Sequence, residues 1–211
     1  MAEPRPSRGE ELAHTLSHGL GLLAALIAGP LLVGQAFAHG KPWGVISASV
    51  FVASIVVMYL ASTLYHAWPA GQGKRAFRTM EHCAIFLLIA GTYTPVSILA
   101  IRGVWGWSLL ASVWVLAIVG ILLKSLASTN HRWLPAVLYL ALAWLVILEI
   151  GPLSASIPFA GIAWLFAGGI AYTAGMAFFA AKSVPYCHFV WHLFVLAGTT
   201  CHFVAIWGYV V

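Results

Sequence analysis

Phe189–Val210, FVWHLFVLAGTTCHFVAIWGYV, is an apolar run that contains no acidic residue and no Lys or Arg. At about 1.5 Å per residue, a helix of this length crosses the roughly 30 Å of a bilayer's hydrocarbon core. The run begins beside His188 and contains His192, and histidines are costly side chains to place in lipid. It therefore predicts a transmembrane helix and raises the question of what the two histidines bind.

Six further apolar runs of similar length precede it, separated by short breaks that contain Gly, Pro or charged residues. Of the 211 residues, 62% are hydrophobic and only 7% are charged, against about 25% charged residues in a soluble domain. Lipid offers no hydrogen-bond partners to backbone N–H and C=O groups, so runs of this length form helices, which pair these groups internally. We predict an all-α integral membrane protein, a seven-transmembrane helix bundle. The approximate bounds of its helices are Leu16–Ala38, Val45–Tyr65, Ala84–Ile101, Trp107–Leu123, Leu134–Ile150, Phe159–Ala180 and Phe189–Val210.

The chain is predicted to consist of a short polar N-terminal tail, residues 1–15, and one seven-helix domain, residues 16–211. An alternative is that the first run is a signal peptide, since Ala36–Ala38 matches an A-x-A cleavage site. The run is longer than the about 7–15 residues of a signal core, and Glu10 and Glu11 stand just before it. A retained helix is therefore favoured.

The Lys and Arg residues are distributed unevenly between the two sides of the predicted bundle. The positive-inside rule then places the N-terminus in the cytoplasm and the C-terminus outside. The bases lie in short loops between apolar runs, so they indicate topology and headgroup contacts, and no nucleic-acid partner is predicted. The N-terminal side holds Arg5, Arg8, Lys74, Arg75, Arg78, Lys124, Arg132 and Lys182, and the opposite side holds Lys41 and Arg102.

Four ionisable residues are expected at similar depth on the cytoplasmic side. His66 closes the second helix, Glu81 opens the third, and His188 and His192 open the seventh. Seven helices alternate in direction, so these helix ends meet on one side of the membrane. Because Lys and Arg alone assign the topology, this coincidence is independent support for a shared site.

The i, i+4 spacing of His188 and His192 places both imidazoles on one helical face, where they can bind one metal ion. His66 can supply a third nitrogen, and three histidines with an open fourth position are typical of catalytic zinc. Glu81 is then the candidate general base for a metal-activated water. Ser62, one turn before His66, can hydrogen-bond that water or a substrate carbonyl, or orient Glu81.

Each of these residues also has a purely structural interpretation. A single histidine near a helix end can reach the lipid headgroups as an interfacial residue. Ser62 alone can bond the backbone carbonyl four residues before it. Ionisable residues within membrane segments are, however, functional by default. With three helices converging, a site is favoured for the set.

Other polar residues rank lower as site residues. His14 and His18 flank the start of the first helix, and His18 can reach the rim of the site. His82 is interpreted as an interfacial or supporting residue. Glu149, near the outer end of the fifth helix, is expected to be exposed to the headgroups. His202 lies deeper in the last helix and on a different face, so it is excluded as a further ligand.

Four motifs, taken together and in order, resemble a known family. They resemble the progestin and adiponectin receptor family, and most of all its bacterial hemolysin-III branch. The resemblance spans nearly the whole chain, and the combination is specific although no single motif is. The motifs are SHGLG (Ser17–Gly21), STLYH (Ser62–His66), EHCAIFLLIAGTYTP (Glu81–Pro95) and HFVWH (His188–His192).

The resemblance implies a seven-helix bundle with its N-terminus inside and a buried Zn²⁺ near the cytoplasmic face. By similarity, the zinc ligands are His66, His188 and His192, and Ser62 and Glu81 lie near the zinc-bound water. The family usually has Asp at the position of Glu81. The longer side chain leaves two alternatives open, direct ligation of zinc or action through water.

The leading functional hypothesis is a zinc-dependent intramembrane hydrolase of a ceramide-like lipid amide, which the family's grouping with alkaline ceramidases implies. The alternative is a non-enzymatic hemolysin-III-type protein with a pore-forming, receptor-like or membrane-fluidity role. A metal transporter ranks lowest, because the candidate ligands cluster on one side and no matching set of ionisable residues is predicted on the opposite side. The predicted partners are the bilayer and a membrane lipid, bound as substrate or ligand, and the sequence indicates no oligomeric state.

Overall fold

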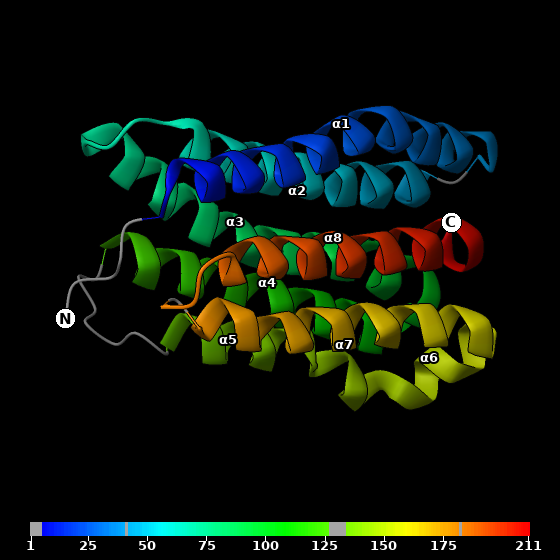
Figure 1. Ribbon diagram of the computed structural model, residues 1–211. Coiled ribbons are helices and arrows are strands. Elements are labelled where there is room, and N and C mark those ends of the chain that lie inside the picture. The colour runs from blue at the N-terminus through cyan, green and yellow to red at the C-terminus, as the bar shows by residue number, and fades with distance from the viewer. Residues whose placement is uncertain (1–5, 41, 127–133, 182) are drawn as a thin grey trace.

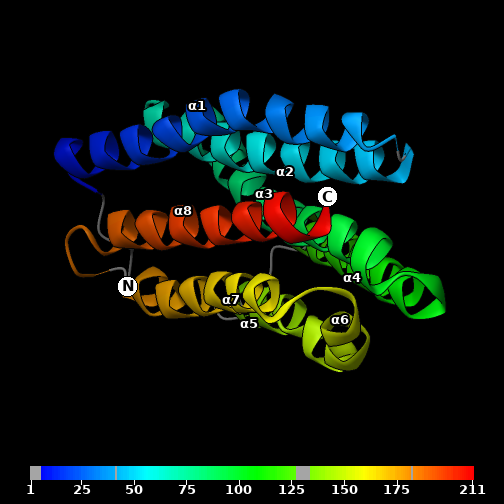
Figure 2. The same cartoon turned by 90° about the vertical axis from the view of Figure 1, so that its right-hand side faces the viewer.

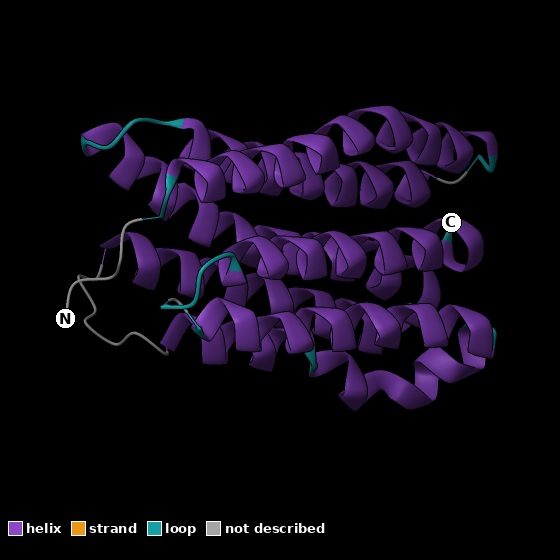
Figure 3. Ribbon diagram, in the orientation of Figure 1, coloured by secondary structure: helices purple, strands orange, loops and turns teal. Residues whose placement is uncertain are grey.

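The structure is a computed structural model that describes residues 6–40, 42–126, 134–181 and 183–211, and within these ranges every regular element is a helix (Figure 3). Seven segments are long and apolar enough to cross a membrane, which confirms the predicted seven-helix class and makes the chain a multi-pass membrane protein. In chain order the elements are α1 (Arg8–Ala38), α2 (Pro42–Ala67), α3 (Gln72–Pro95), η1 (Val96–Ile101), α4 (Gly103–Leu126), α5 (Leu134–Ala143), η2 (Leu145–Glu149), α6 (Ile150–Ser156), α7 (Phe159–Ala180), α8 (Cys187–Ala205) and η3 (Ile206–Val210).

The helices run side by side in a bundle with α3 near its centre (Figures 1 and 2). Both views place α1 and α2 along one edge, α3 and α8 in the middle, and α5, α6 and α7 along the opposite edge. The apolar window of the α3–η1 span is 78% buried, whereas no other span exceeds 50%. The first three helices and α8 therefore surround the same interior, although α8 comes from the other end of the chain.

Helix α1 begins at Arg8, within the predicted tail 1–15. Ser7 and Glu10 form a capping box: the Ser7 Oγ accepts the Glu10 N–H at 3.2 Å, and Glu10 Oε2 accepts the Ser7 N–H at 2.8 Å. This pair satisfies two backbone donors that a helix start leaves free. The cap thus extends α1 by two turns before its apolar part at Leu16, which brings Glu11 and His14 into the bundle.

The expectation that the bases lie in short loops is wrong for part of the chain. Lys74, Arg75 and Arg78 lie on the first turns of α3, and Lys124 lies in the last turn of α4. Lys, Arg and Gln are good helix formers, so the helices continue beyond their apolar parts. The N-terminal orientation stays a prediction, and four of the bases behind it, Arg5, Lys41, Arg132 and Lys182, lie outside the described residues.

Two spans end in π-helical turns on the side opposite the helix ends that carry the candidate ligands. In the third span, the wider turn of η1 follows directly after Pro95. Proline lacks the N–H that an α-helix needs and clashes with the preceding turn, so the pattern of backbone hydrogen bonds changes there. Helix α8 also passes into a π-helical turn, η3, at Ile206, but without a proline.

Helices α2 and α3 are in contact at Gly91, where a Cβ atom would collide with the Ser54 side chain. We expect Gly91→Ala to cost about 1–3 kcal/mol of stability, the usual range for overpacking a filled interior. Gly34→Ala in α1 is the matched control, because nothing lies within 4 Å of a Cβ there. Thermal unfolding in detergent checks this: the midpoint should fall for Gly91→Ala and not for Gly34→Ala, and equal midpoints would contradict the close contact.

Candidate metal centre

The ends of α2, α3 and α8 bring four possible metal ligands together. One ligand atom from each of His66, Glu81, His188 and His192 lies within 4.8 Å of the other three. His66 and Glu81 are each 6% exposed, and His192 is fully buried. These residues are here called the inner group. His188 is partly buried. Three imidazoles and one carboxylate with ligand atoms this close can hold a metal ion.

The ring of His192 is oriented by a serine of α1. Its Nδ1 lies 3.0 Å from the Oγ of Ser17, and that hydroxyl donates its only hydrogen to the carbonyl oxygen of His14 at 2.9 Å. The serine can therefore only accept from the imidazole, so Nδ1 carries the ring hydrogen. The Nε2 atom of His192 is left with a free lone pair inside the inner group.

The ring of His66 is oriented by a carboxylate of the same helix α1. Its Nδ1 lies 2.7 Å from Glu11 Oε2, and its Nε2 lies 3.6 Å from Glu81 Oε1. Lys74 holds the other oxygen of Glu11, with an Nζ–Oε1 distance of 2.7 Å. A carboxylate on the outer nitrogen of a ligand histidine is the usual way of fixing its tautomer and raising its basicity.

Glu81 is held by a relay that begins at His18. The Oγ of Ser62 donates to Glu81 Oε1 at 2.6 Å and lies 2.7 Å from His18 Nδ1, which must donate to it. The ring of His18 stacks on His192, with centroids 3.7 Å apart and planes within 3°. Ser62 therefore bonds the carboxylate of Glu81 and not its own backbone. Helix α1 thus supports Glu81 through His18, and it contacts His192 through Ser17 and His18.

The inner group contains buried ring nitrogens for which the described residues offer no hydrogen-bond partner. They are the Nε2 atoms of His66, His188 and His192. An unpaired polar atom in an apolar interior costs roughly 1–3 kcal/mol. Three such lone pairs beside one carboxylate match the nitrogen and oxygen ligands of a divalent transition metal. The residues present therefore fit a metal ion.

The structure thus brings together all five residues that the sequence indicated, namely Ser62, His66, Glu81, His188 and His192. Their roles as ligands or as catalytic groups stay predictions.

Sequence reasoning missed the contribution of α1. His14 and His18, of which only His18 was expected to reach the rim of the site, are 1% and 0% exposed. Glu11 and Ser17 were not considered as site residues. The spacing of Glu11, His14 and His18 (i, i+3, i+7) puts these residues on one helical face. That spacing was the available signal, and it needed a helix that begins before Leu16.

The remaining polar residues lie outside the inner group. His82 is buried, not interfacial, and its Nδ1 bonds the Arg78 carbonyl oxygen at 2.6 Å. His202 lies apart, with Nε2 3.1 Å from the Leu165 carbonyl oxygen. The expectation that Glu149 is exposed is wrong, because it is 9% exposed. It ends the 3₁₀ turn η2, whose three residues per turn rotate the side chain away from its α-helical direction.

We expect Ser17→Ala to weaken metal binding about tenfold or more, the range for removing a partner of a ligand histidine. The hydroxyl fixes the tautomer of His192 and would no longer do so. Ser47→Ala is the matched control, since Ser47 is also buried and also bonds the carbonyl three residues earlier, that of Gly44. Titration with a competing chelator measures the affinity, and equal values for both variants would contradict this role of Ser17.

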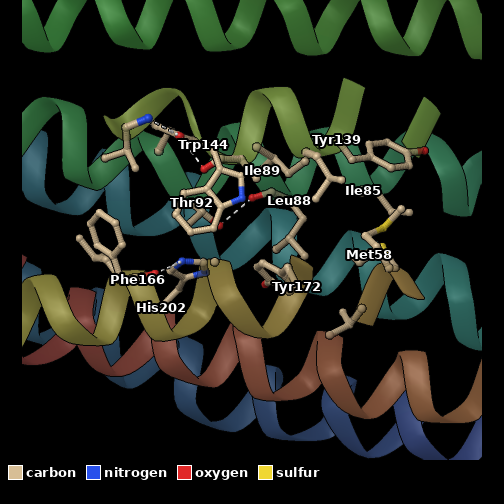
Figure 4. A pocket seen from close by; sticks show the side chains of 18 of the residues that line it. Met58, Ile85, Leu88, Ile89, Thr92, Tyr139, Trp144, Phe166, Tyr172 and His202 are labelled. Atoms are coloured by element: carbon tan, nitrogen blue, oxygen red, sulfur yellow. Dashed lines mark hydrogen bonds between the residues drawn. The ribbon is translucent and has the colours of Figure 1, made fainter. Parts of the chain in front are cut away.

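An apolar pocket lies deeper in the bundle, between α3, α5, α7 and α8 (Figure 4). Its empty volume is about 980 Å³, part of it open to the surroundings, and its lining is almost wholly apolar. Met58 and Trp191 line it near the inner group, one turn from Ser62 and next to His192 in the chain. His202 lines it farther along α8. The apolar lining of the pocket is suited to an apolar ligand.

Comparison with known proteins gives concordant matches. A model of the family described as "Haemolysin-III related" matches residues 7–203. The "Hemolysin-3 homolog" of Bacillus subtilis (strain 168) is 38% identical over 96% of this chain and 95% of that protein. "Hemolysin-3" of Bacillus cereus is 38% identical over 95% and 92%. The human "Monocyte to macrophage differentiation factor" is 26% identical over 97% and 86%. The resemblance inferred from the four motifs is confirmed.

Proposed function

The chain belongs to the hemolysin-III-related family, and from this premise we propose that it is a zinc-dependent intramembrane hydrolase of a ceramide-like lipid amide. We place it in a bacterial inner (plasma) membrane, as its similarity to the Bacillus proteins suggests, with its N-terminus in the cytoplasm, as the distribution of Lys and Arg favours. The observation that carries the proposal is the carboxylate of Glu81, buried among imidazole nitrogens without partners and held by Ser62 at 2.6 Å.

His66, His188 and His192 would hold the ion through their Nε2 atoms, to which the described part of the chain offers no hydrogen-bond partner. Zinc in such a site supplies Lewis acidity towards a carbonyl oxygen and towards water. Its identity is favoured by the three-imidazole set, which leaves one position for Glu81, water or substrate.

Glu81 is the proposed general base, which takes a proton from the attacking water and returns it to the leaving amine. Ser62 fixes the orientation of the Glu81 carboxylate, because its hydroxyl donates to Oε1 and itself accepts a hydrogen bond from His18. The burial of the group excludes bulk water, and electrostatic contacts are stronger in such a site. These residues therefore combine a metal-binding position with a positioned base.

The apolar pocket supports a lipid as the substrate (Figure 4). Its polar lining groups are largely engaged: the Trp144 Nε1 donates to Thr173, the Tyr139 hydroxyl to the His82 carbonyl, and the Thr92 hydroxyl to the Leu88 carbonyl. A chain without polar groups fits such a lining best. An acyl chain in this pocket would bring its carboxyl end towards the inner group.

We expect the purified protein to release fatty acid from a ceramide-like lipid in mixed micelles, and a chelator to stop the release. Added Zn²⁺ should restore it, because the ion polarises the amide carbonyl. Chromatography of the released fatty acid measures the reaction. Release that continues after the metal has been removed, as checked by elemental analysis, would contradict the proposal.

The relatives' names favour one further candidate, a membrane-permeabilising protein, since the Bacillus cereus protein is called a hemolysin. Dye release from loaded liposomes tests it. Release by the wild type that is unaffected by His188→Ala would favour this function over hydrolysis, whereas no release from intact liposomes would leave hydrolysis as the better account.

A further inference from the structure

A second set of possible ligands adjoins the inner group. Glu11, His14 and His66 each offer a ligand atom, and these atoms lie within 4.8 Å of one another. They are here called the outer group. Glu11 and His14 come from α1 and His66 from α2, so the two groups share a single imidazole.

His14 has no evident structural role. It is 1% exposed, and for neither of its ring nitrogens do the described residues offer a hydrogen-bond partner. Its ring packs against those of His66, His188 and His192, with centroid distances of 4.5, 4.9 and 5.2 Å. Leaving both nitrogens unpaired in this interior is costly. A bound cation is the partner that an imidazole among other metal ligands fits best.

The carboxylate of Glu11 completes the outer group. Its Oε2 lies 3.9 Å from His14 Nδ1 and 2.7 Å from His66 Nδ1. Two ligands about 2.0–2.2 Å from one tetrahedral ion lie roughly 3.4 Å apart, so small side-chain shifts suffice to bind one. Lys74 contacts the other oxygen, Oε1. An ion bound between Oε2 and His66 Nδ1 would replace the hydrogen that they share, and His66 would then carry its hydrogen on Nε2, towards Glu81.

The ring of His66 lies between the two groups. Its Nδ1 faces Glu11 and its Nε2 faces Glu81, at 2.7 and 3.6 Å. Two divalent ions on opposite sides of one neutral ring would repel strongly in a medium of low dielectric. The charges of Glu11, Glu81 and Lys74 balance a single divalent ion far better than two. The groups are therefore suited to alternative occupancy by one ion.

Glu11 and its partner Lys74 lie nearer the surface than His66 and Glu81. The side chains of Glu11 and Lys74 are 22% and 19% exposed, whereas those of His66 and Glu81 are 4% and 7% exposed. A buried metal site needs a path by which its ion arrives. Glu11 is the only carboxylate that contacts His66 from the exposed side among the described residues.

We propose that Glu11, His14 and His66 form an outer divalent-cation site, which takes up the ion before it passes across the ring of His66 to the inner group. The proposal rests on a metal in the inner group, as the proposed function requires, but it does not depend on hydrolysis.

The outer site can be isolated by removing two inner ligands. His188→Ala/His192→Ala protein in detergent should still bind about one Co²⁺ per chain, weakly, as measured by equilibrium dialysis with elemental analysis. Adding His14→Asn or Glu11→Gln should each weaken that binding about tenfold or more. Adding His82→Asn should leave it unchanged, because His82 is a buried histidine outside both groups. Absence of binding, or binding that neither outer variant weakens, would overturn the site.

The role in uptake is tested with both groups otherwise intact. His14→Asn should slow Co²⁺ loading of the metal-free protein about tenfold, followed by visible absorbance, while the final content remains that of the wild type. Circular dichroism confirms that each variant is folded. Unchanged loading would overturn the uptake role. Normal loading and hydrolysis without an outer site would refute this inference alone, whereas a wild type that binds no Co²⁺ would refute the proposed function as well.

Discussion

Replacement of His192 by alanine should leave the purified protein without its metal ion and without hydrolytic activity. His192 is fully buried, its Nδ1 is held by Ser17, and its Nε2 has no partner among the described residues. The substitution removes one of three proposed nitrogen ligands and leaves only weak binding by the outer group. After dialysis that removes weakly held ions, elemental analysis should find metal in the wild type and near none in the variant.

His202→Ala is the matched control for this experiment. His202 is a histidine of the same helix α8, but it bonds the Leu165 carbonyl oxygen and lies outside the inner group. We expect it to keep the metal content of the wild type, although its stability falls because a packed ring is lost. Equal metal content in both variants would show that His192 is no ligand.

Replacement of Glu81 by glutamine should lower hydrolysis by about 10²- to 10⁴-fold, the usual contribution of a general base. The amide keeps the size of the side chain and can still accept from Ser62, but it cannot take up a proton. Steady-state release of fatty acid measures the effect. The metal content separates the two alternatives for Glu81, because an ion that is retained indicates action through water and an ion that is lost indicates direct ligation.

Two further variants serve as controls for Glu81→Gln. Glu81→Asp should retain most of the activity, because it keeps a carboxylate near the same place. Glu149→Gln changes the other buried glutamate, which lies in η2 and in neither ligand group. It should leave metal content and activity unchanged. Wild-type activity in Glu81→Gln would show that Glu81 is not the general base.

Much of the fold could be predicted because each membrane span is a long apolar segment, and helices of soluble proteins lack such long uninterrupted apolar segments. The run Phe189–Val210 corresponds closely to the span Cys187–Val210. The start of the third span was misjudged, at Ala84 instead of Gln72. Polar helix formers continue a helix into the headgroup region without any apolar signal, so hydropathy alone sets its start too late.

The inner group could be anticipated because helix direction and depth follow from topology, and few polar residues lie at that depth. The support from α1 could not. The contact between Ser17 and His192 joins residues 175 positions apart, and neither periodicity nor charge predicts which face of α1 meets α8. Glu11 was noted only as a charge that precedes the first apolar run, whereas in the structure the capped start of α1 carries it to His66.

The order in which the ligands are synthesised bears on how the protein matures. His66 and Glu81 enter the membrane early, whereas His188 and His192 belong to the last helix. At about 5–20 residues per second, the ribosome needs several seconds to make the intervening chain. Until then the nascent protein can hold an ion only at the outer group of α1 and α2, because the inner group lacks two of its proposed ligands. Transfer of the ion to the inner group would therefore mark the completed insertion of α8.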